Sequence, residues 1–488
     1  MLNWLIPLIL GTGLGMLTTF PLAAWLSGIF LLRASRLLTP GASYLAIVAA
    51  STLTAFVTTR GLVPLEVLPS AIMAVSGALL VALVFLADRQ LRSKLPDWAS
   101  LFVLPTGLTF LEFASSAASP FGSWGSMAYS QYGVLPLMQL ASITGIWGIT
   151  FLIALAATVT NLAWERGWRQ TRPVLASYVV LLGLVFGYGA TRLSLPATGE
   201  LVRIAGITVP TSTPSGELAE RAARAGTDRA AWVAIEADAH SVTERLLDMS
   251  LREAEAGARV ILWSEANALV TPDGEKSLIA RAQAIARTHD AYLGLGFGLI
   301  AQHQPLSLEN RLVLIGPEGV LWDYAKVKRV PGLETEIVPE SSGSIRVAET
   351  PLGRVSGAIG FDTDFPPLLY EAGKQKVDLL LSPARDWEGV DPRHTEQAVF
   401  RAIEQGFTLV RQARDGWSVV ADSRGRVLSA LDRRPEAAVM RADVPIARQP
   451  SPYTELGDLF PFACMLAFLG LLGSGTILAK QEQEAKLD

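Results

Sequence analysis

The segment VSGAIGFDTDFPP, residues 355–367, decides how this chain folds and how far its chemistry can be read. It closes a pattern of three blocks that lie far apart in the sequence. The first block, RVILWSE at 259–265, is an apolar, strand-like run that ends at Glu265. The second, DYAKVKRVPGLE at 323–334, contains Lys326, and the third places Gly360 after the run GRVSGA. Side chains just past strands can project into one cleft above a sheet, so the blocks predict a single site.

Each of these residues also has a simpler interpretation. Glu265 alone could be a strand-end carboxylate that caps the next segment. Lys326 and Lys328 are two residues apart and would share a face of an extended segment, so spacing does not choose between them. Gly360 has no side-chain heteroatom and therefore offers no nucleophile.

Glutamate, lysine and cysteine in this order, each just past a strand, resemble the carbon–nitrogen hydrolase (nitrilase) superfamily. Its third block usually reads Ile-Cys-Tyr-Asp/Glu, with Phe-Pro a few residues later. This chain reads IGFD at 359–362, with FP at 365–366. The resemblance therefore implies that Gly360 occupies the nucleophile position, that Phe361 replaces the usual tyrosine, and that Asp362 retains the acid.

The resemblance also implies roles for the other residues of the site. Glu265 would transfer protons and Lys326 would stabilise an oxyanion. The family spacing of Tyr-x-Lys, Val-Pro and a later glutamate selects Lys326 over Lys328, with Tyr324 and Glu334 as supporting residues. Glu334 could equally be an exposed loop charge.

The segment 379–428 resembles the later half of the same family. Asp386 and Trp387 lie in its loop, where they are further supporting candidates. His394 is more simply a polar contact at a helix N-terminus than a catalyst. Arg401 and Glu404, three residues apart on a predicted helix, are most simply an ion pair.

Residues 201–446 alternate between strand-like and helical patterns, which favours a layered α/β domain with buried sheets. The resemblance makes this an αββα sandwich. Strands are predicted at 203–209, 259–264, 292–300, 311–315, 355–360, 377–382, 408–412, 417–421 and 426–430. Helices are predicted at 229–256, 276–288, 367–374 and 393–405.

The chain as a whole is too apolar for an ordinary soluble enzyme, because of roughly its first 190 residues and one stretch near the end. Half of its 488 residues are hydrophobic, and the mean hydropathy is +0.35. A membrane span needs about 20 apolar residues, with shorter ones tolerated. About eight spans are predicted, at 5–18, 20–32, 44–58, 68–86, 98–113, 135–164, 174–188 and 460–478.

Basic residues are placed unevenly around these spans. If the spans alternate in direction, four clusters fall on one side, and the opposite loops carry little beyond Arg60. Cytoplasmic loops of membrane proteins are enriched in Lys and Arg, so the α/β domain is predicted to be extracytoplasmic. The clusters are Arg33 and Arg36; Arg89, Arg92 and Lys94; Arg166, Arg169 and Arg172; and Lys480 and Lys486.

The segment SPFGSWGSMAYSQYGVLPLMQLASITGIWGITFLI, residues 119–153, closely resembles the corresponding part of the bacterial apolipoprotein N-acyltransferase family. Trp124 and Tyr129 contribute to this likeness and are candidate membrane-side substrate residues, although both also suit an interfacial aromatic belt. The family layout predicts a transmembrane bundle at 1–195, an extracytoplasmic nitrilase-like domain at 201–447 and a last span at 458–479.

The resemblance implies a multi-pass protein of the bacterial inner membrane. It also implies acyl transfer from a phospholipid to the N-terminal amine of a lipoprotein through a thioester, with no cofactor. The only cysteine is Cys464, inside the last span, so no metal site can rest on thiolates. The net charge of −4, with no basic stripe in the α/β domain, argues against nucleic-acid binding.

Without a cysteine at 360, three functions remain open. The chain could be a pseudoenzyme that binds lipid or lipoprotein and regulates an active paralogue. It could be an altered enzyme in which Glu265 activates a water beside Gly360 for slow amide or ester hydrolysis. It could also be a non-catalytic membrane protein whose α/β domain is a docking module. Ser356, Thr363 and Asp364 are the other nearby nucleophiles, but each is a poor thiolate substitute.

Overall fold

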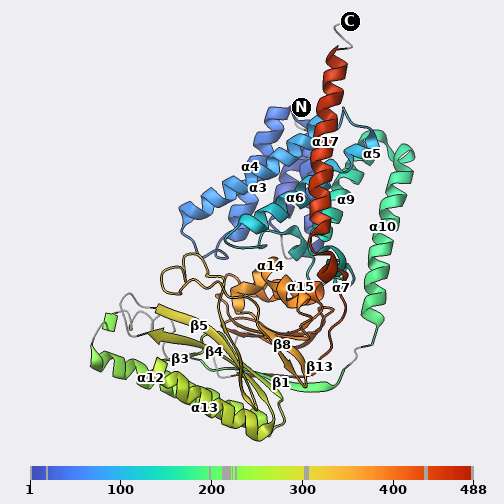
Figure 1. Cartoon of the computed structure of the whole chain (residues 1–488). Coiled ribbons are helices and arrows are strands. Elements are labelled where there is room, and N and C mark those ends of the chain that lie inside the picture. The colour runs from blue at the N-terminus through green and yellow to red at the C-terminus, as the bar shows by residue number, and fades with distance from the viewer. Residues whose placement is uncertain are drawn as a thin grey trace. The chain divides into compact units, whose positions relative to one another are not determined.

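The chain forms two compact units in the computed structural model (Figure 1). The structure describes residues 3–484 except 18–19, 197–198, 211–220, 222–223, 226–227, 302–306 and 433–437. The first unit, here the helical unit, comprises Met1–Leu195 and Glu455–Asp488. The second, here the sandwich unit, comprises Pro196–Thr454.

Six helices in the described part of the helical unit are long and apolar enough to cross a membrane. The predicted membrane bundle is therefore confirmed, while the total of eight spans stays a prediction. The six are α3 (Pro40–Thr59), α4 (Val67–Leu91), α5 with α6 (Asp97–Ser100 and Val103–Ala118), α9 (Trp147–Arg166), α10 (Trp168–Ser194) and α17 (Leu459–Glu484).

The predicted spans at the N-terminus and at 135–164 differ in detail from the helices. The chain begins with two shorter helices, α1 (Leu5–Gly15) and α2 (Pro21–Leu37), and Pro21 is the first residue of α2. The long apolar stretch at 135–164 is not one helix. It forms α7 (Leu135–Met138) and α8 (Ala141–Thr144) before α9, because Gly145 adopts φ +64° and interrupts the helical path.

Helix α9 is the centre of the helical unit. It is buried along most of its length and packs against α2, α6 and α10 (Figure 1). The side chain of Asn161 on α9 donates to the backbone oxygen of Ile29 on α2, at 3.0 Å. This bond satisfies a polar group that hydrocarbon would leave unpaired.

Ion pairs join three of the predicted basic clusters at one end of the bundle. Arg36 on α2 binds Asp88 on α4 through two nitrogens, each at 3.0 Å, and also binds Glu165 on α9. Arg92 binds Glu165 at 3.1 Å. Arg92 and Arg166 share Asp97 of α5, at 2.8 and 3.1 Å. These clusters therefore share one end of the helical unit.

Two sheets form the core of the sandwich unit. The seven-stranded sheet has the order β13-β1-β2-β4-β5-β6, with β3 paired to β4. The six-stranded sheet has the order β12-β11-β10-β9-β8-β7. The strands are β1 (Leu201–Thr208), β2 (Val260–Trp263), β3 (Ala268–Val270), β4 (Tyr292–Ala301), β5 (Ser307–Gly316), β6 (Gly319–Ala325), β7 (Val347–Thr350), β8 (Gly353–Gly357), β9 (Leu379–Arg385), β10 (Thr408–Arg414), β11 (Ser418–Ala421), β12 (Val427–Leu431) and β13 (Ala438–Pro445).

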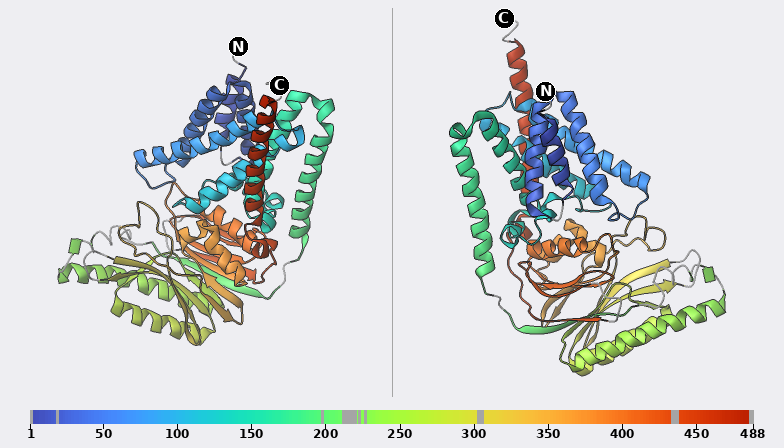
Figure 2. Two further views of the ribbon diagram at one scale, coloured as in Figure 1. Left: turned by 45° about the horizontal axis from the view of Figure 1, so that its top comes forward. Right: turned by 180° about the vertical axis from the view of Figure 1, so that it is seen from behind.

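Two helices cover the outer face of each sheet (Figure 2). Helices α12 (Arg229–Glu255) and α13 (Pro272–His289) pack on the first sheet, and α14 (Pro366–Lys374) and α15 (Arg393–Gln405) on the second. Strands β1 and β2 contact β10 and β9 across the interface between the sheets. The predicted αββα sandwich is confirmed.

The strands that precede Glu265 and Gly360 both lie in parallel parts of their sheets. Strand β2 runs parallel to β1 and β4, and its four residues VILW are all buried, as expected of a strand covered on both faces. Strands β8, β9 and β10 are also parallel. Strand β8 covers Gly353–Gly357, so the strand predicted at 355–360 began two residues late and ran three residues past its end. Sequence patterns missed β3, β6, β7 and β13.

Candidate functional site

Glu265 lies just beyond the end of β2 and is almost fully buried, with 4% of its surface exposed. Its Oε1 atom accepts hydrogen bonds from Lys326 Nζ and Asn310 Nδ2, both at 2.7 Å. Its Oε2 atom accepts from the backbone N–H of Arg385, at 2.9 Å. The next residue, Ala266, has φ +44°, a conformation that costs about 1–2 kcal/mol for a residue with a Cβ. The contacts of Glu265 therefore hold the turn after β2 in this strained conformation.

Lys326 lies directly after β6 and is buried between two carboxylates. Its Nζ donates to Glu265 Oε1 and to Glu334 Oε1, each at 2.7 Å. Burial alone would lower the pKa of Lys326, but the two carboxylates outweigh burial and raise it above the ordinary lysine value. Glu334 is fixed in turn by the backbone N–H of Val330, at 2.8 Å. The neighbouring Lys328 instead lies over the ring of Phe365, at 4.8 Å.

Gly360 is buried and opens a short 3₁₀ turn, η2 (Gly360–Asp364). Its φ is +42°, in the left-handed region that favours glycine. A Cβ added at Gly360 would overlap the Oε2 atom of Glu265 and would also contact Ala384, at 3.7 Å. The three sequence blocks thus meet at one place, and the Glu265 carboxylate occupies the space beside Gly360.

Asp362 ties this turn to the lysine segment. Its carboxylate accepts from the Tyr324 hydroxyl at 2.8 Å and from the backbone N–H groups of Lys328, Val327 and Ile359, at 2.7, 3.2 and 3.1 Å. Every contact donates to the carboxylate, which suits its ionised form. Burial raises the pKa of Asp362 to about 7, against the lowering effect of the Lys326 ammonium and of these donors.

A second buried polar cluster lies on the other side of η2. His394 at the start of α15 contacts Asp386 Oδ1 through Nδ1 at 3.1 Å and Asp364 Oδ2 through Nε2 at 3.2 Å. Arg411 on β10 binds both oxygens of Asp386, at 2.8 and 3.0 Å. Burial would raise the pKa of Asp386, but Arg411 and His394 lower it below its usual value. The cluster connects η2 to α15 and β10.

Aromatic rings surround this cluster. The Trp387 ring packs edge-on against His394, with 5.4 Å between centroids, and Phe361 lies 6.0 Å from the same ring. On α15 the predicted ion pair is present: Arg401 and Glu404 are both buried, with 2.7 Å between Nη1 and Oε2. Trp387 and Phe361 therefore belong to the packing around His394.

Three other nucleophilic side chains lie near Gly360 in the sequence, and each contacts a partner of its own. Ser356 on β8 donates to the backbone oxygen of Arg346, at 2.6 Å. Thr363 donates to the backbone oxygen of Gly360, at 2.8 Å. Asp364 faces His394, as described above. Cys464 belongs to α17 of the helical unit. None of these contacts places a nucleophile in the position of a residue-360 side chain.

The two membrane-side candidates lie in the segment between α6 and α7 of the helical unit. The Tyr129 hydroxyl is 2.5 Å from Ser123 Oγ, and the Trp124 ring packs on Phe121 with 5.4 Å between centroids. Glu112 on α6 anchors the same segment. Its carboxylate accepts from the backbone N–H of Met127 at 3.0 Å, from Ser126 Oγ at 2.9 Å and from Thr150 Oγ1 at 2.7 Å.

Sequence analysis did not select Asn310, although its side chain holds the Glu265 carboxylate. No local signal marked it, because Asn310 lies in the polar half of β5, SLENR at 307–311, before the apolar run that predicted the strand. Among the described residues, no group of three or more His, Cys, Asp and Glu side chains could hold a metal ion.

Comparison with known proteins places both parts of the chain. Residues 229–449 match the carbon-nitrogen hydrolase family, and residues 12–159 match the apolipoprotein N-acyltransferase N-terminal domain. The chain is 26% identical to the apolipoprotein N-acyltransferase of Geobacter metallireducens over 347 residues, covering 65% of this chain and 63% of that protein. It is 31% identical to the one of Rhodopseudomonas palustris over 186 residues, covering 33% and 34%.

A crystal structure of an amidase from Nesterenkonia sp. is similar to 54% of this chain and 95% of its own, with 20% identity and a TM-score of 0.42. The sequence matches, together with the fold, define a membrane protein with a carbon–nitrogen hydrolase domain. More particularly, the chain is similar to the apolipoprotein N-acyltransferases, which its residues 12–159 and the two relatives above match. The matched regions span 63% and 34% of the lengths of the two relatives.

Proposed function

We propose that this chain binds the ligands of the apolipoprotein N-acyltransferase family, phospholipid and lipoprotein, without forming the thioester on which acyl transfer depends. One observation carries the proposal: the Glu265 carboxylate occupies the space beside Gly360 where a nucleophilic side chain would lie. With no covalent intermediate, the two-step transfer loses its first step. Each increase of about 1.4 kcal/mol in the barrier lowers the rate tenfold.

The charged frame around that space supports a retained binding role. Glu265, Lys326 and Glu334 form a continuous chain of ion pairs centred on the buried Lys326, and Asp362 receives four donors. The Lys326 ammonium can polarise a ligand carbonyl oxygen without covalent chemistry. Regulation of an active paralogue would be one use of such binding.

A water-using hydrolase is the second candidate, and the hydrogen bonding of Glu265 favours it specifically. Oε2 faces Gly360 and accepts a hydrogen bond from the backbone N–H of Arg385. A carboxylate in this position can take a proton from a water. Lys326 would then stabilise the oxyanion of an amide or ester substrate.

Radiolabelled phospholipid separates these functions. Full-length protein in mixed micelles is incubated with phosphatidylethanolamine labelled in an acyl chain and with a diacylated lipopeptide that carries a free N-terminal amine. The binding proposal expects saturable retention of lipopeptide and no labelled lipopeptide product. Transfer of label to the lipopeptide, or absence of saturable binding, would refute it. Release of free fatty acid that Glu265→Gln abolishes and Lys328→Ala does not would establish the hydrolase instead.

We also propose that the sandwich unit faces the extracytoplasmic side of the bacterial inner membrane. Three basic clusters gather at one end of the helical unit, and positive loops remain cytoplasmic. Gly257 is a suitable reporter position because a Cβ there meets no atom within 4 Å. A Gly257→Cys, Cys464→Ala variant should react with a membrane-impermeant maleimide in intact spheroplasts. Labelling that appears only after lysis would reverse the orientation.

A further inference from the structure

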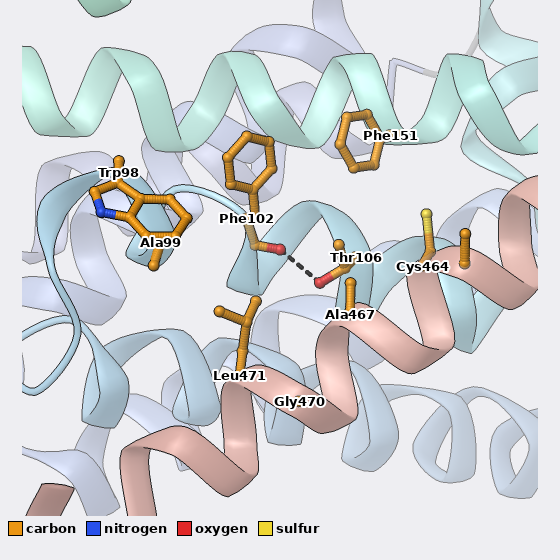
Figure 3. A pocket seen from close by; sticks show the side chains of 10 residues that line it. Trp98, Ala99, Phe102, Thr106, Phe151, Cys464, Ala467, Gly470 and Leu471 are labelled. Carbon is orange, nitrogen blue, oxygen red and sulfur yellow. Dashed lines mark hydrogen bonds between the residues drawn. The ribbon is translucent and has the colours of Figure 1, made fainter.

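Three membrane helices enclose an apolar groove in the helical unit (Figure 3). The segment α5–α6 contributes Trp98 and Phe102, α9 contributes Phe151, and α17 contributes the opposite wall. In Figure 3 the three aromatic side chains follow one side of the groove, and Ala467 and Cys464 of α17 lie on the other. The groove has a volume of about 460 Å³.

The lining of the groove offers no polar partner to a ligand. Its exposed surface is entirely apolar. The hydroxyl of Thr106, the one side-chain hydroxyl among the lining residues, donates to the backbone oxygen of Phe102, at 2.5 Å. A polar ligand would lose its hydrogen bonds to water here and gain none in return. The groove therefore selects an apolar occupant.

The size of the groove excludes another helix. Two turns of a helix that is about 10–12 Å across, with a pitch of about 5.4 Å, fill roughly 1,000 Å³, about twice the volume of the groove. At about 30 Å³ for each water-sized group, 460 Å³ holds roughly fifteen such groups, the size of one lipid acyl chain. The walls are three of the helices of membrane-spanning length, so hydrocarbon is the medium that reaches the groove.

We propose that this groove binds one acyl chain of a membrane phospholipid as a structural lipid. Lipid tails are as apolar as the groove, so the hydrophobic effect does not drive this binding. The attraction comes from close packing, because an unfilled groove would leave its lining without partner atoms on one side. Phe102 and Phe151, stacked with 6.4 Å between ring centroids, provide a flat wall for such contacts.

The groove has space for a ligand because small residues of α17 line one of its walls. Ala467 and Gly470 line the groove and are exposed in the structure, and a Cβ added at Gly470 meets no atom within 4 Å. Leucine at these two positions would fill the groove without disturbing the helix packing. Gly473 provides a matched control, because it lies on the same helix, is exposed, has equal room for a Cβ, and does not line the groove.

Photo-crosslinking tests the proposal on the full-length protein in phospholipid vesicles. The probe is a phosphatidylethanolamine with a diazirine near the end of one acyl chain, and crosslinked peptides are mapped by mass spectrometry. We expect labelled peptides from 98–106 and 463–471. The double variant Ala467→Leu, Gly470→Leu should lower this labelling about tenfold, which corresponds to losing roughly ten close carbon–carbon contacts. The control Gly473→Leu should retain it.

Equal labelling of all lipid-facing helices, or equal labelling of both variants, would overturn the proposal. The association state of the vesicle-embedded protein, measured by single-molecule photobleaching, checks a second copy of the chain as the occupant. If the double variant changes association and leaves lipid labelling intact, a protein contact and not a lipid fills the groove. The groove lies wholly in the helical unit, so these outcomes are independent of acyl transfer or ligand binding by the sandwich unit.

Discussion

Glu265 and Gly360 compete for one space: the Oε2 atom of the glutamate lies so close to the Cβ position of residue 360 that a Cβ there would overlap it. The carboxylate is held there by Lys326, Asn310 and the backbone of Arg385. Glycine at 360 is therefore part of the local packing as well as the loss of a nucleophile. A side chain can return to this position only if Glu265 moves.

Gly360→Ala tests this relationship without adding chemistry. We expect the free energy of unfolding of the sandwich unit to fall by about 2–4 kcal/mol, from the left-handed backbone and from the displaced carboxylate. Native-state hydrogen exchange of the β1 and β2 backbone measures it. Gly257→Ala is the matched control, with φ +90° and open space around its Cβ. It should cost only the backbone term, and an equal cost at both positions would show that Glu265 does not obstruct residue 360.

Gly360→Cys, made in a Cys464→Ala background, should yield a thiol whose pKa depends on Glu265. The new side chain would meet the Glu265 carboxylate, which disfavours a thiolate, and Lys326 is paired with that carboxylate. Adding Glu265→Gln removes that negative charge, so the thiol pKa should fall. Iodoacetamide labelling rates against pH give the thiol pKa of both variants. Gly257→Cys is the exposed reference, whose thiol pKa should lie at the ordinary value of about 8.5. An unchanged thiol pKa would mean that the two side chains do not interact.

Removal of Lys326 should be far more damaging than removal of Lys328. Lys326→Ala leaves the buried Glu265 and the partly buried Glu334 without their cation, a type of change that costs about 3–5 kcal/mol at a buried pair. Lys328→Ala removes a contact with the Phe365 ring worth about 0.5–1 kcal/mol. Protease resistance of the sandwich unit in the purified full-length chain ranks the two. Similar losses would contradict the assignment of Lys326 as the central cation.

Asp362 should make the stability of the sandwich unit fall as pH rises from about 4 to 7. Its pKa is raised from 3.8 to about 7, so in this window the folded state retains a proton that the unfolded state has lost. Stability is full below the window and decreases through it, by up to about 1.4 kcal/mol per pH unit.

Asp362→Asn should remove that slope, even though its amide group faces hydrogen-bond donors and lowers stability at every pH. Hydrogen exchange of the Ile359 and Lys328 backbone N–H groups, followed from pH 4 to 7, reports the local effect. Glu349→Gln, at an exposed carboxylate, should leave the slope unchanged. A slope that persists in Asp362→Asn would assign it to another group.

Much of the fold could be predicted because hydrophobic patterns report burial directly. Strand β2 and helix α15 were placed closely, since an unbroken apolar run and a clear helical period leave few alternatives. Strands β6 and β13 were missed because their exposed faces carry mixed residues that blur the alternation. The interruption at Gly145 was missed because a positive φ leaves no mark on hydropathy.

The site was only partly predictable. The order of the three blocks placed Glu265 and Lys326 beside Gly360, but it could not show that the carboxylate itself fills the space there. Asn310 and the pairing of Asp364 with His394 depend on contacts between distant strands and helices, for which local spacing carries no signal. That these residues bind ligands without catalysing acyl transfer stays a prediction.

The arginines at one end of the helical unit have two roles, one during membrane insertion and one in the folded bundle. In the proposed orientation, Arg36, Arg92 and Arg166 are free cations while the chain is inserted, and they keep their loops on the cytoplasmic side. Once folding is complete, Asp88, Asp97 and Glu165 neutralise the same side chains and fasten four helices together. Biogenesis and mechanical cohesion thus draw on one set of residues, and a substitution chosen to redirect topology would also loosen the finished bundle.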